Sequence, residues 1–240
     1  MTFDGESAVI AGLAATFAMT LFYVWALWVG WLHLDFARLL GDGVMRHGPG
    51  TVVVGLLLHF ASGGAFGLLY AALFDIVGLS PTPIALLVGA GFGVFHFLLA
   101  MPLIHLAGNL GARHRLPGDV NPGEWGINYG PQEAGLRLVG HMLYGTVMAA
   151  IYSALKVDPA YRTAALATAV VSVVGLVVLY QRLFQQGELE IRRQGQAPTQ
   201  RHLSTDEVLA ARARVQQRFE QGEITFDEYQ RQRRSYAIDP

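Results

Sequence analysis

Long apolar runs dominate the first three quarters of the chain and are separated by shorter polar stretches. A transmembrane helix needs roughly 20 apolar residues, because the hydrocarbon layer of a membrane is about 30 Å thick. Five runs reach that length, at residues 8–34, 52–76, 83–106, 136–155 and 162–184. The first run lacks the basic flank and the cleavage site of a signal peptide, so we expect it to be a retained helix. The pattern therefore predicts five transmembrane helices.

Composition supports the same conclusion. Hydrophobic residues make up 52% of the chain and charged residues 15%, which is typical of helices that lie in lipid. The predicted fold class is an all-α integral membrane protein whose surroundings are a lipid bilayer. The 17 Lys and Arg residues nearly balance the 18 Asp and Glu residues, so the net charge gives no support to nucleic-acid binding. The absence of cysteine excludes disulfides and thiolate metal sites.

Basic residues near the ends of the runs predict the orientation, because they are enriched on the cytoplasmic side of membrane proteins. Only Lys156 and Arg162 fall on the side where the first run begins. The basic residues on the other side are Arg38, Arg46, Arg113, Arg115, Arg137, Arg182, Arg192 and Arg193. We therefore expect a multi-pass protein of the bacterial cytoplasmic membrane, with its N-terminus outside and its C-terminus in the cytoplasm.

A short pattern occurs twice, in the second and fourth runs. His59 and His141 begin the two copies, and each is followed by glycine four residues later, by tyrosine eleven residues later, and then by Ala-Leu. Steps of four and eleven residues turn an α-helix about 40° and 20° from the starting point, so the three side chains form one stripe. We interpret the copies as a parallel repeat of two hairpins, formed by the second and third runs and by the fourth and fifth runs.

Three uses of this stripe are open. In the first, two facing histidines bind one haem b in an apolar pocket with small residues beside them. The residues expected to bind that haem are His59, His141, Gly63, Gly145, Tyr70 and Tyr152. In the second, His59, His105 and His141 hold a copper or zinc ion. In the third, which we favour, there is no cofactor: the histidines donate hydrogen bonds to neighbouring helices and the glycines permit close packing.

Small residues also predict how the helices pair. Gly63, Gly64 and Gly67 form a small-residue face on the second run, and Gly89 and Gly93 form part of another on the third. Such faces let helix backbones approach closely in a membrane. We therefore expect the second and third runs to form one tight hairpin.

Catalytic motifs are missing from the chain. It has no phosphate loop, no nucleophile elbow and no paired acidic residues within a run. We therefore predict a protein that is not an enzyme: an accessory or scaffold subunit of a bacterial membrane complex. The long segment 108–135 would be a lid over the histidines or a docking surface for another subunit. The alternatives are an electron carrier that uses the His59 and His141 pair, and a small-solute transporter.

The polar region after residue 184 predicts a separate unit. Residues 185–204 read as a linker between a transmembrane domain, residues 1–184, and a C-terminal module, residues 205–240. Thr205 should open a helix that stops at Gly222, and Thr225 with Glu228 forms a capping box for a second helix.

A Gly-Glu-Ile-Thr turn joins the two predicted helices of this module, from Gly222 to Thr225. With this turn, residues 212–236 resemble the bacterial short C-terminal domain (SHOCT) family. The resemblance implies a cytosolic interaction module that binds other membrane subunits or joins copies of the chain into a homo-oligomer. The membrane part is similar to uncharacterised bacterial integral membrane proteins around Met19 and His141, a likeness that carries no known activity.

Overall fold

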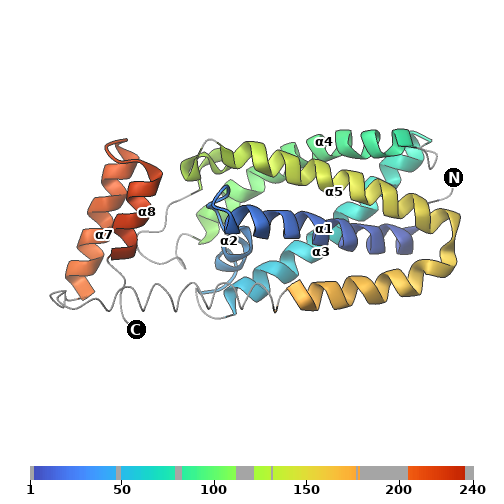
Figure 1. The fold of residues 1–240 in the computed structure, drawn as a ribbon, viewed down its shortest axis with the longest axis horizontal. Coiled ribbons are helices and arrows are strands. Elements are labelled where there is room, and N and C mark those ends of the chain that lie inside the picture. The colour runs from blue at the N-terminus through green and yellow to red at the C-terminus, as the bar shows by residue number, and fades with distance from the viewer. Residues whose placement is uncertain are drawn as a thin grey trace.

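The computed structural model describes residues 3–46, 50–78, 83–111, 122–130, 132–176, 178 and 205–235. Over these residues the protein is helical and contains no strand. Five helices are long and apolar enough to cross a membrane: α1 (Gly5–Trp28), α3 (Thr51–Ile76), α4 (Pro83–Leu110), α5 (Gln132–Val157) and the fifth helix, Pro159–Leu176. They run side by side along the long axis of the molecule (Figure 1). Over the described residues, the prediction of an all-helical protein with five helices long and apolar enough to span a membrane is confirmed.

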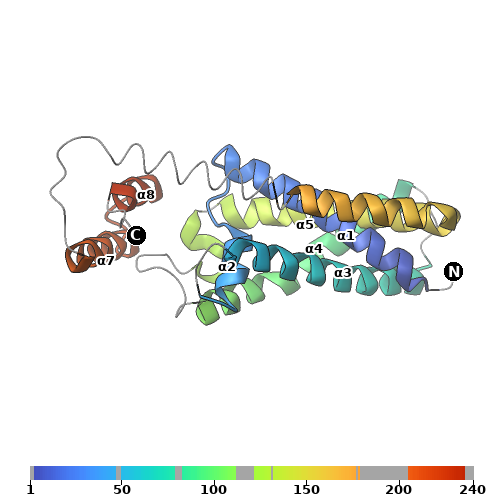
Figure 2. The same cartoon turned by 90° about the horizontal axis from the view of Figure 1, so that it is seen from below.

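The two ends of this bundle carry different elements. We call the end at which α1 begins the amino end. The opposite end, which we call the loop end, holds the short helices α2 (Phe36–Asp42) and η2 (Glu124–Tyr129). Two further helices, α7 (Thr205–Glu220) and α8 (Phe226–Ser235), lie beyond the loop end (Figures 1 and 2).

α1 ends earlier than the apolar pattern predicted. The apolar run continues past Trp28, but the helix stops there because Gly30 adopts a φ of 77°. Glycine takes this left-handed conformation without steric cost. The backbone N–H groups of Trp31 and Leu32 then donate to the carbonyl of Ala26 at 2.8 and 3.0 Å. The chain therefore turns back over the loop end and does not extend α1 further.

α1 and α3 pack through glycine. A Cβ atom placed on Gly12 of α1 would lie 2.6 Å from the carbonyl oxygen of Gly63 and 3.0 Å from the Cα of Gly67. Both distances are shorter than a normal contact, so only glycine fits at this crossing. Contacts this close strengthen van der Waals packing, which drives helix association in lipid.

α4 and α5 form a second glycine interface. A Cβ on Gly89 would lie 2.7 Å from the Cβ of Ala149, and a Cβ on Gly93 would lie 2.6 Å from the Cα of Met142. The small-residue face of α4 therefore packs on α5, whereas that of α3 packs on α1. This corrects the expected tight hairpin of the second and third spans. α3 and α4 meet through large rings, such as the stacked pair of Phe66 and His96.

The fifth helix lies along the outside of α1 and α3 (Figures 1 and 2). Val173 and Leu176 pack against Val24, Leu56 and Phe60 in one apolar cluster. Only 11% of its most apolar stretch is buried in the protein, compared with 61% for α1. Most of this helix is therefore exposed to the surroundings of the bundle.

Two helices, α7 and α8, lie in the C-terminal part of the chain, which we call the C-terminal unit. α7 ends at Glu220 and Gly222 adopts a φ of 72°, which allows the chain to reverse. The predicted capping box is formed: the Thr225 backbone N–H donates to Glu228 Oε2 at 2.9 Å, and the Glu228 N–H donates to Thr225 Oγ1 at 3.3 Å. The predicted linker, residues 185–204, lies outside the described residues.

Candidate functional site

The two copies of the repeated stripe meet inside the bundle. His59 on α3 and His141 on α5 are buried, at 7% and 6% exposure. Tyr144, which lies within the second copy, donates a 2.6 Å hydrogen bond to the carbonyl of Gly63 in the first. This bond satisfies a hydroxyl that has no access to water and joins α5 to α3.

His141 is fixed by its own helix and by α1. Its Nδ1 atom lies 2.7 Å from the carbonyl oxygen of Arg137, and this carbonyl can only accept, so Nδ1 carries the proton. Tyr23 of α1 donates to the same carbonyl at 3.1 Å. Nδ1 of His141 is therefore used by a contact within the bundle.

His96 of α4 completes the cluster around His141. Its ring lies edge-on to that of His141 at 4.8 Å and to that of Tyr144 at 5.1 Å. It also stacks on Phe66 at 3.7 Å. His96 lies outside the two copies of the repeated pattern, so the pattern did not point to it. We call His96, His141, Tyr23, Tyr70 and Tyr144 the histidine cluster.

His59 lies apart from the ring contacts of this cluster. Its ring packs edge-on against Phe36 at 5.1 Å and Phe60 at 6.1 Å. Its Nε2 atom is buried and has no hydrogen-bond partner in the part of the chain that the structure describes.

The residues predicted to hold a haem do not line one pocket. A side chain on Gly63 would collide with Thr16 of α1, and one on Gly145 would collide with the backbone of Gly89 on α4. α1 and α4 therefore occupy the space that was expected for a porphyrin. Tyr70 is 1% exposed and lies in the histidine cluster. The other predicted tyrosine, Tyr152, lies at the amino end. These residues do not fit a haem between α3 and α5.

The predicted metal ligands are also not brought together. Among the described residues, no group of three His, Asp or Glu side chains is placed to hold a metal ion. Of the three predicted ligands, His59 and His141 are described above. The third, His105, lies within hydrogen-bond distance of Asn109 on its own helix, with 2.9 Å between His105 Nε2 and Asn109 Nδ2.

A buried ion pair at the loop end is the feature that sequence reasoning missed. Glu133 and Arg137 are 0% and 1% exposed, and Arg137 Nη2 lies 3.1 Å from Glu133 Oε2. Glu133 Oε1 also accepts the backbone N–H groups of His33 and Leu34, at 2.5 and 3.0 Å. Arg137 donates in turn to the carbonyl of Leu34 at 2.8 Å. The pair therefore fastens the segment after α1 to α5.

The spacing of this pair held a signal. Glu133, Arg137 and His141 are four residues apart, so they share one face of a helix. Glu133 was expected to lie in the segment 108–135, because the apolar run of this span begins only at residue 136. The helix begins at Gln132, so both charges lie on its inner face.

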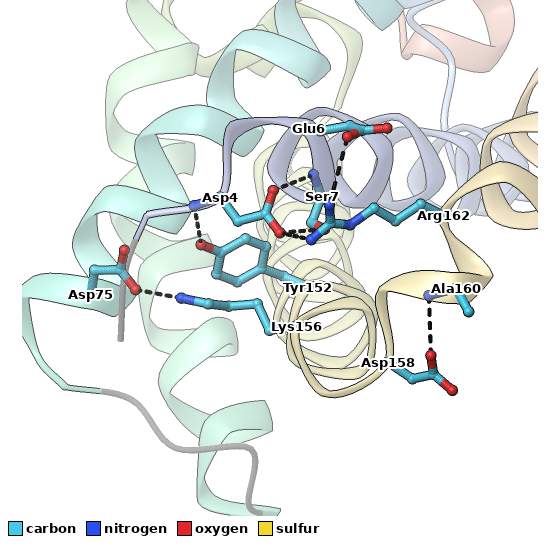
Figure 3. Close-up of polar contacts among 9 residues, drawn as sticks. All are labelled: Asp4, Glu6, Ser7, Asp75, Tyr152, Lys156, Asp158, Ala160 and Arg162. Atoms are coloured by element: carbon cyan, nitrogen blue, oxygen red, sulfur yellow. Dashed lines mark hydrogen bonds and ion pairs between the residues drawn. The ribbon is translucent and has the colours of Figure 1, made fainter.

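A second polar group closes the amino end (Figure 3). Asp4 caps α1 by accepting the backbone N–H of Ser7 at 3.2 Å and its hydroxyl at 2.9 Å, and it also pairs with Arg162 of the fifth helix. Lys156 of α5 pairs with Asp75 of α3 at 2.9 Å. These contacts join the ends of four helices.

The Asp4 carboxyl carries a shifted pKa. Burial raises the pKa of Asp4, but the hydrogen bonds from Ser7 and the positive charges of Arg162 and Lys156 outweigh burial and hold this pKa below its ordinary value of 3.8. Asp4 is therefore a carboxylate at neutral pH.

Comparison with known proteins finds no matching family model, no matching curated protein and no matching solved structure. The resemblance of residues 212–236 to short C-terminal domains stays a prediction.

Proposed function

We propose that the protein is a non-catalytic accessory or scaffold subunit of a bacterial cytoplasmic-membrane complex. The observation that carries this proposal is the fifth helix, of whose most apolar stretch only 11% is buried. Lipid can cover such a helix. However, the side chains on its exposed side favour another helix as the neighbour.

Three small residues and one valine form a stripe on that exposed side. Ala164, Thr168, Val171 and Gly175 are all exposed, and their spacing of four, three and four residues keeps them on one face. A Cβ on Gly175 would meet nothing within 4 Å, so its small size serves no packing inside the described part of this chain. Small residues at this spacing let another helix approach closely in a membrane.

The polar groups inside the bundle support a structural role. Three side chains donate hydrogen bonds to backbone carbonyls of this chain: Tyr144, His141 and Arg137. Glu133 accepts hydrogen bonds from two backbone N–H groups of the chain. Polar residues in membranes often serve in this way, as links between helices. We assign them to holding the bundle, and we assign partner binding to the fifth helix, segment 108–135 and the C-terminal unit.

Orientation belongs to the same proposal. The distribution of basic residues favours an N-terminus outside and a C-terminus in the cytoplasm. The loop end and α7–α8 would then face the cytoplasm, where they could bind further subunits or a second copy of the chain. The parallel repeat of the spans is also part of this proposal. The hydrogen bond from Tyr144 to Gly63, which joins the two stripes, supports it.

The test is extraction of the tagged protein from its native membrane in a mild detergent, followed by size-exclusion chromatography. We expect it to elute with other membrane chains. Gly175→Leu should reduce their recovery, because the larger side chain would hold a partner helix away. Val170→Leu is the matched control, since Val170 is 53% exposed and lies on the same helix away from the stripe.

Two outcomes would contradict the proposal. One is elution of the wild-type protein as a lone monomer. The other is equal recovery of the same chains with Gly175→Leu and Val170→Leu, which would show that the stripe faces lipid alone.

A further inference from the structure

The aromatic residue Phe226 joins the C-terminal unit to the loop end. Phe226, the first residue of α8, places its ring 4.5 Å from that of His33 and 5.9 Å from that of Tyr129. His33 follows α1 and Tyr129 closes η2, so the two rings come from different loops. We call His33 and Tyr129 the loop-end platform.

The apolar seam of the C-terminal unit continues onto this platform. Val215, Ile224 and Tyr229 are its buried residues, and Tyr229 is only 1% exposed. Tyr129 of the bundle packs against the same cluster. A two-helix unit has little core of its own, so a surface that extends the seam stabilises it.

Hydrogen bonds hold His33 of the platform in place. The backbone N–H of His33 donates to Glu133, whose partner Arg137 supplies the carbonyl to which His141 donates. The position of His33 is therefore tied to the buried ion pair and, through it, to the histidine cluster. A docking residue on such a support needs no ordering when its partner arrives.

We infer that the loop-end platform is the docking site of the α7–α8 unit of the same chain, with Phe226 as its anchor, and that this docking competes with partner proteins for the loop end. The competition with partner proteins rests on the proposed function, because it describes how partner binding to the loop end is regulated. A tethered module binds at an effective concentration set by its linker, so a small aromatic contact holds it in place and still yields to a competing partner.

Distance measurement between two spin labels tests the docking without any partner. The chain has no native cysteine, so Val44→Cys after α2 and Ala213→Cys on α7 give two unique labelling sites, both exposed. We expect a narrow distance distribution in the otherwise wild-type full-length protein. Phe226→Ala should raise the ratio of undocked to docked units by roughly 5- to 150-fold, the effect expected for two lost ring contacts.

Phe219→Ala is the matched control. The ring of Phe219 contacts those of Tyr229 and Phe226 inside the C-terminal unit, at 4.9 and 5.9 Å. It should broaden the distribution less than Phe226→Ala does. Equal broadening would mean that both variants loosen the unit itself, and the assignment of Phe226 as the anchor would be overturned.

Singly labelled chains decide which copy docks. If a mixture of Val44→Cys and Ala213→Cys proteins gave the short distance, the unit would dock on a second copy, and the inference would fail.

The competition with partner proteins is tested by the detergent extraction described above, in which Phe226→Ala should recover more of the associated chains than the wild type. If the docking distance were confirmed but Phe226→Ala recovered no more of the associated chains than the wild type, the competition would be overturned and the docking would stand. Lone elution of every variant would instead overturn the proposed function.

Discussion

The ion pair of Glu133 and Arg137 allows the stability of the loop end to be tested quantitatively. Glu133→Ala removes a carboxylate that accepts from two backbone N–H groups and from Arg137. The two side chains are 0% and 1% exposed, so water cannot replace the lost partner. Removing one member of a buried pair costs about 3–5 kcal/mol, whereas an exposed pair contributes about 0–1 kcal/mol. We expect Glu133→Ala to lower the free energy of unfolding by about 3–5 kcal/mol.

Two further variants separate the charge from the hydrogen bonds. Glu133→Gln keeps an oxygen that can accept the N–H groups of His33 and Leu34, so it should lose less than Glu133→Ala. Arg137→Met removes the charge and leaves the carboxylate with its two backbone donors. In the double variant, Glu133→Gln with Arg137→Met, no unpaired charge remains. Its loss should therefore be smaller than the sum of the two single losses.

Reversible unfolding in mixed detergent micelles, followed by circular dichroism, measures these losses. Arg218→Met is the control, because Arg218 and its partner Glu223 are 48% and 53% exposed at their side chains. It should change the free energy by less than about 1 kcal/mol. Losses as small as this for Glu133→Ala and Arg137→Met would show that the pair is solvated, and the argument from burial would be refuted.

Three other predictions concern the helix interfaces, the amino end and the histidines. Gly12→Val should lower the free energy of unfolding in the same assay by about 1–3 kcal/mol because its side chain meets the backbone of α3, whereas Gly91→Val, which points into open space, should be tolerated. Because the pKa of Asp4 is lowered, its ionised carboxylate stabilises the fold fully above the ordinary pKa of 3.8, and this stabilisation is lost as the pH falls through the lowered value. Asp4→Asn should therefore weaken the fall in the free energy of unfolding at acid pH, measured by unfolding at a series of pH values. Optical spectra of the purified protein, oxidised and dithionite-reduced, should show no Soret band and should not change in His59→Ala or His141→Ala, while a band lost in either variant would restore the haem hypothesis.

The elements of this fold were predictable because their signals are local. An apolar run of the required length can satisfy its backbone in lipid only as a helix, so all five spans followed from the sequence. The capping box at Thr225 and Glu228 and the left-handed Gly222 are equally local, and both lie where the sequence put them.

The pairing of helices was less accessible, because glycine marks a close contact without identifying the partner. Gly63 of α3 and Gly89 of α4 were expected to face each other. Gly63 instead packs on α1, and Gly89 packs on α5. Chain order favoured the hairpin of α3 and α4. The structure instead brings α3 to α1, where Thr16 fills the space beside Gly63.

The inner face of α5 explains why the histidine motif looked like a cofactor site. Arg137 bonds to the loop after α1, Tyr144 to α3, and Tyr152 accepts from the backbone of Asp4 at 3.4 Å. A helix that joins several neighbouring segments by polar contacts needs buried polar residues at helical spacing, and such spacing is also what a ligand site requires. Sequence alone cannot separate the two, because the distinction lies in where the hydrogen bonds end. Here those of Arg137 and Tyr144 end on backbone carbonyls of the same chain, so these two residues hold the bundle together.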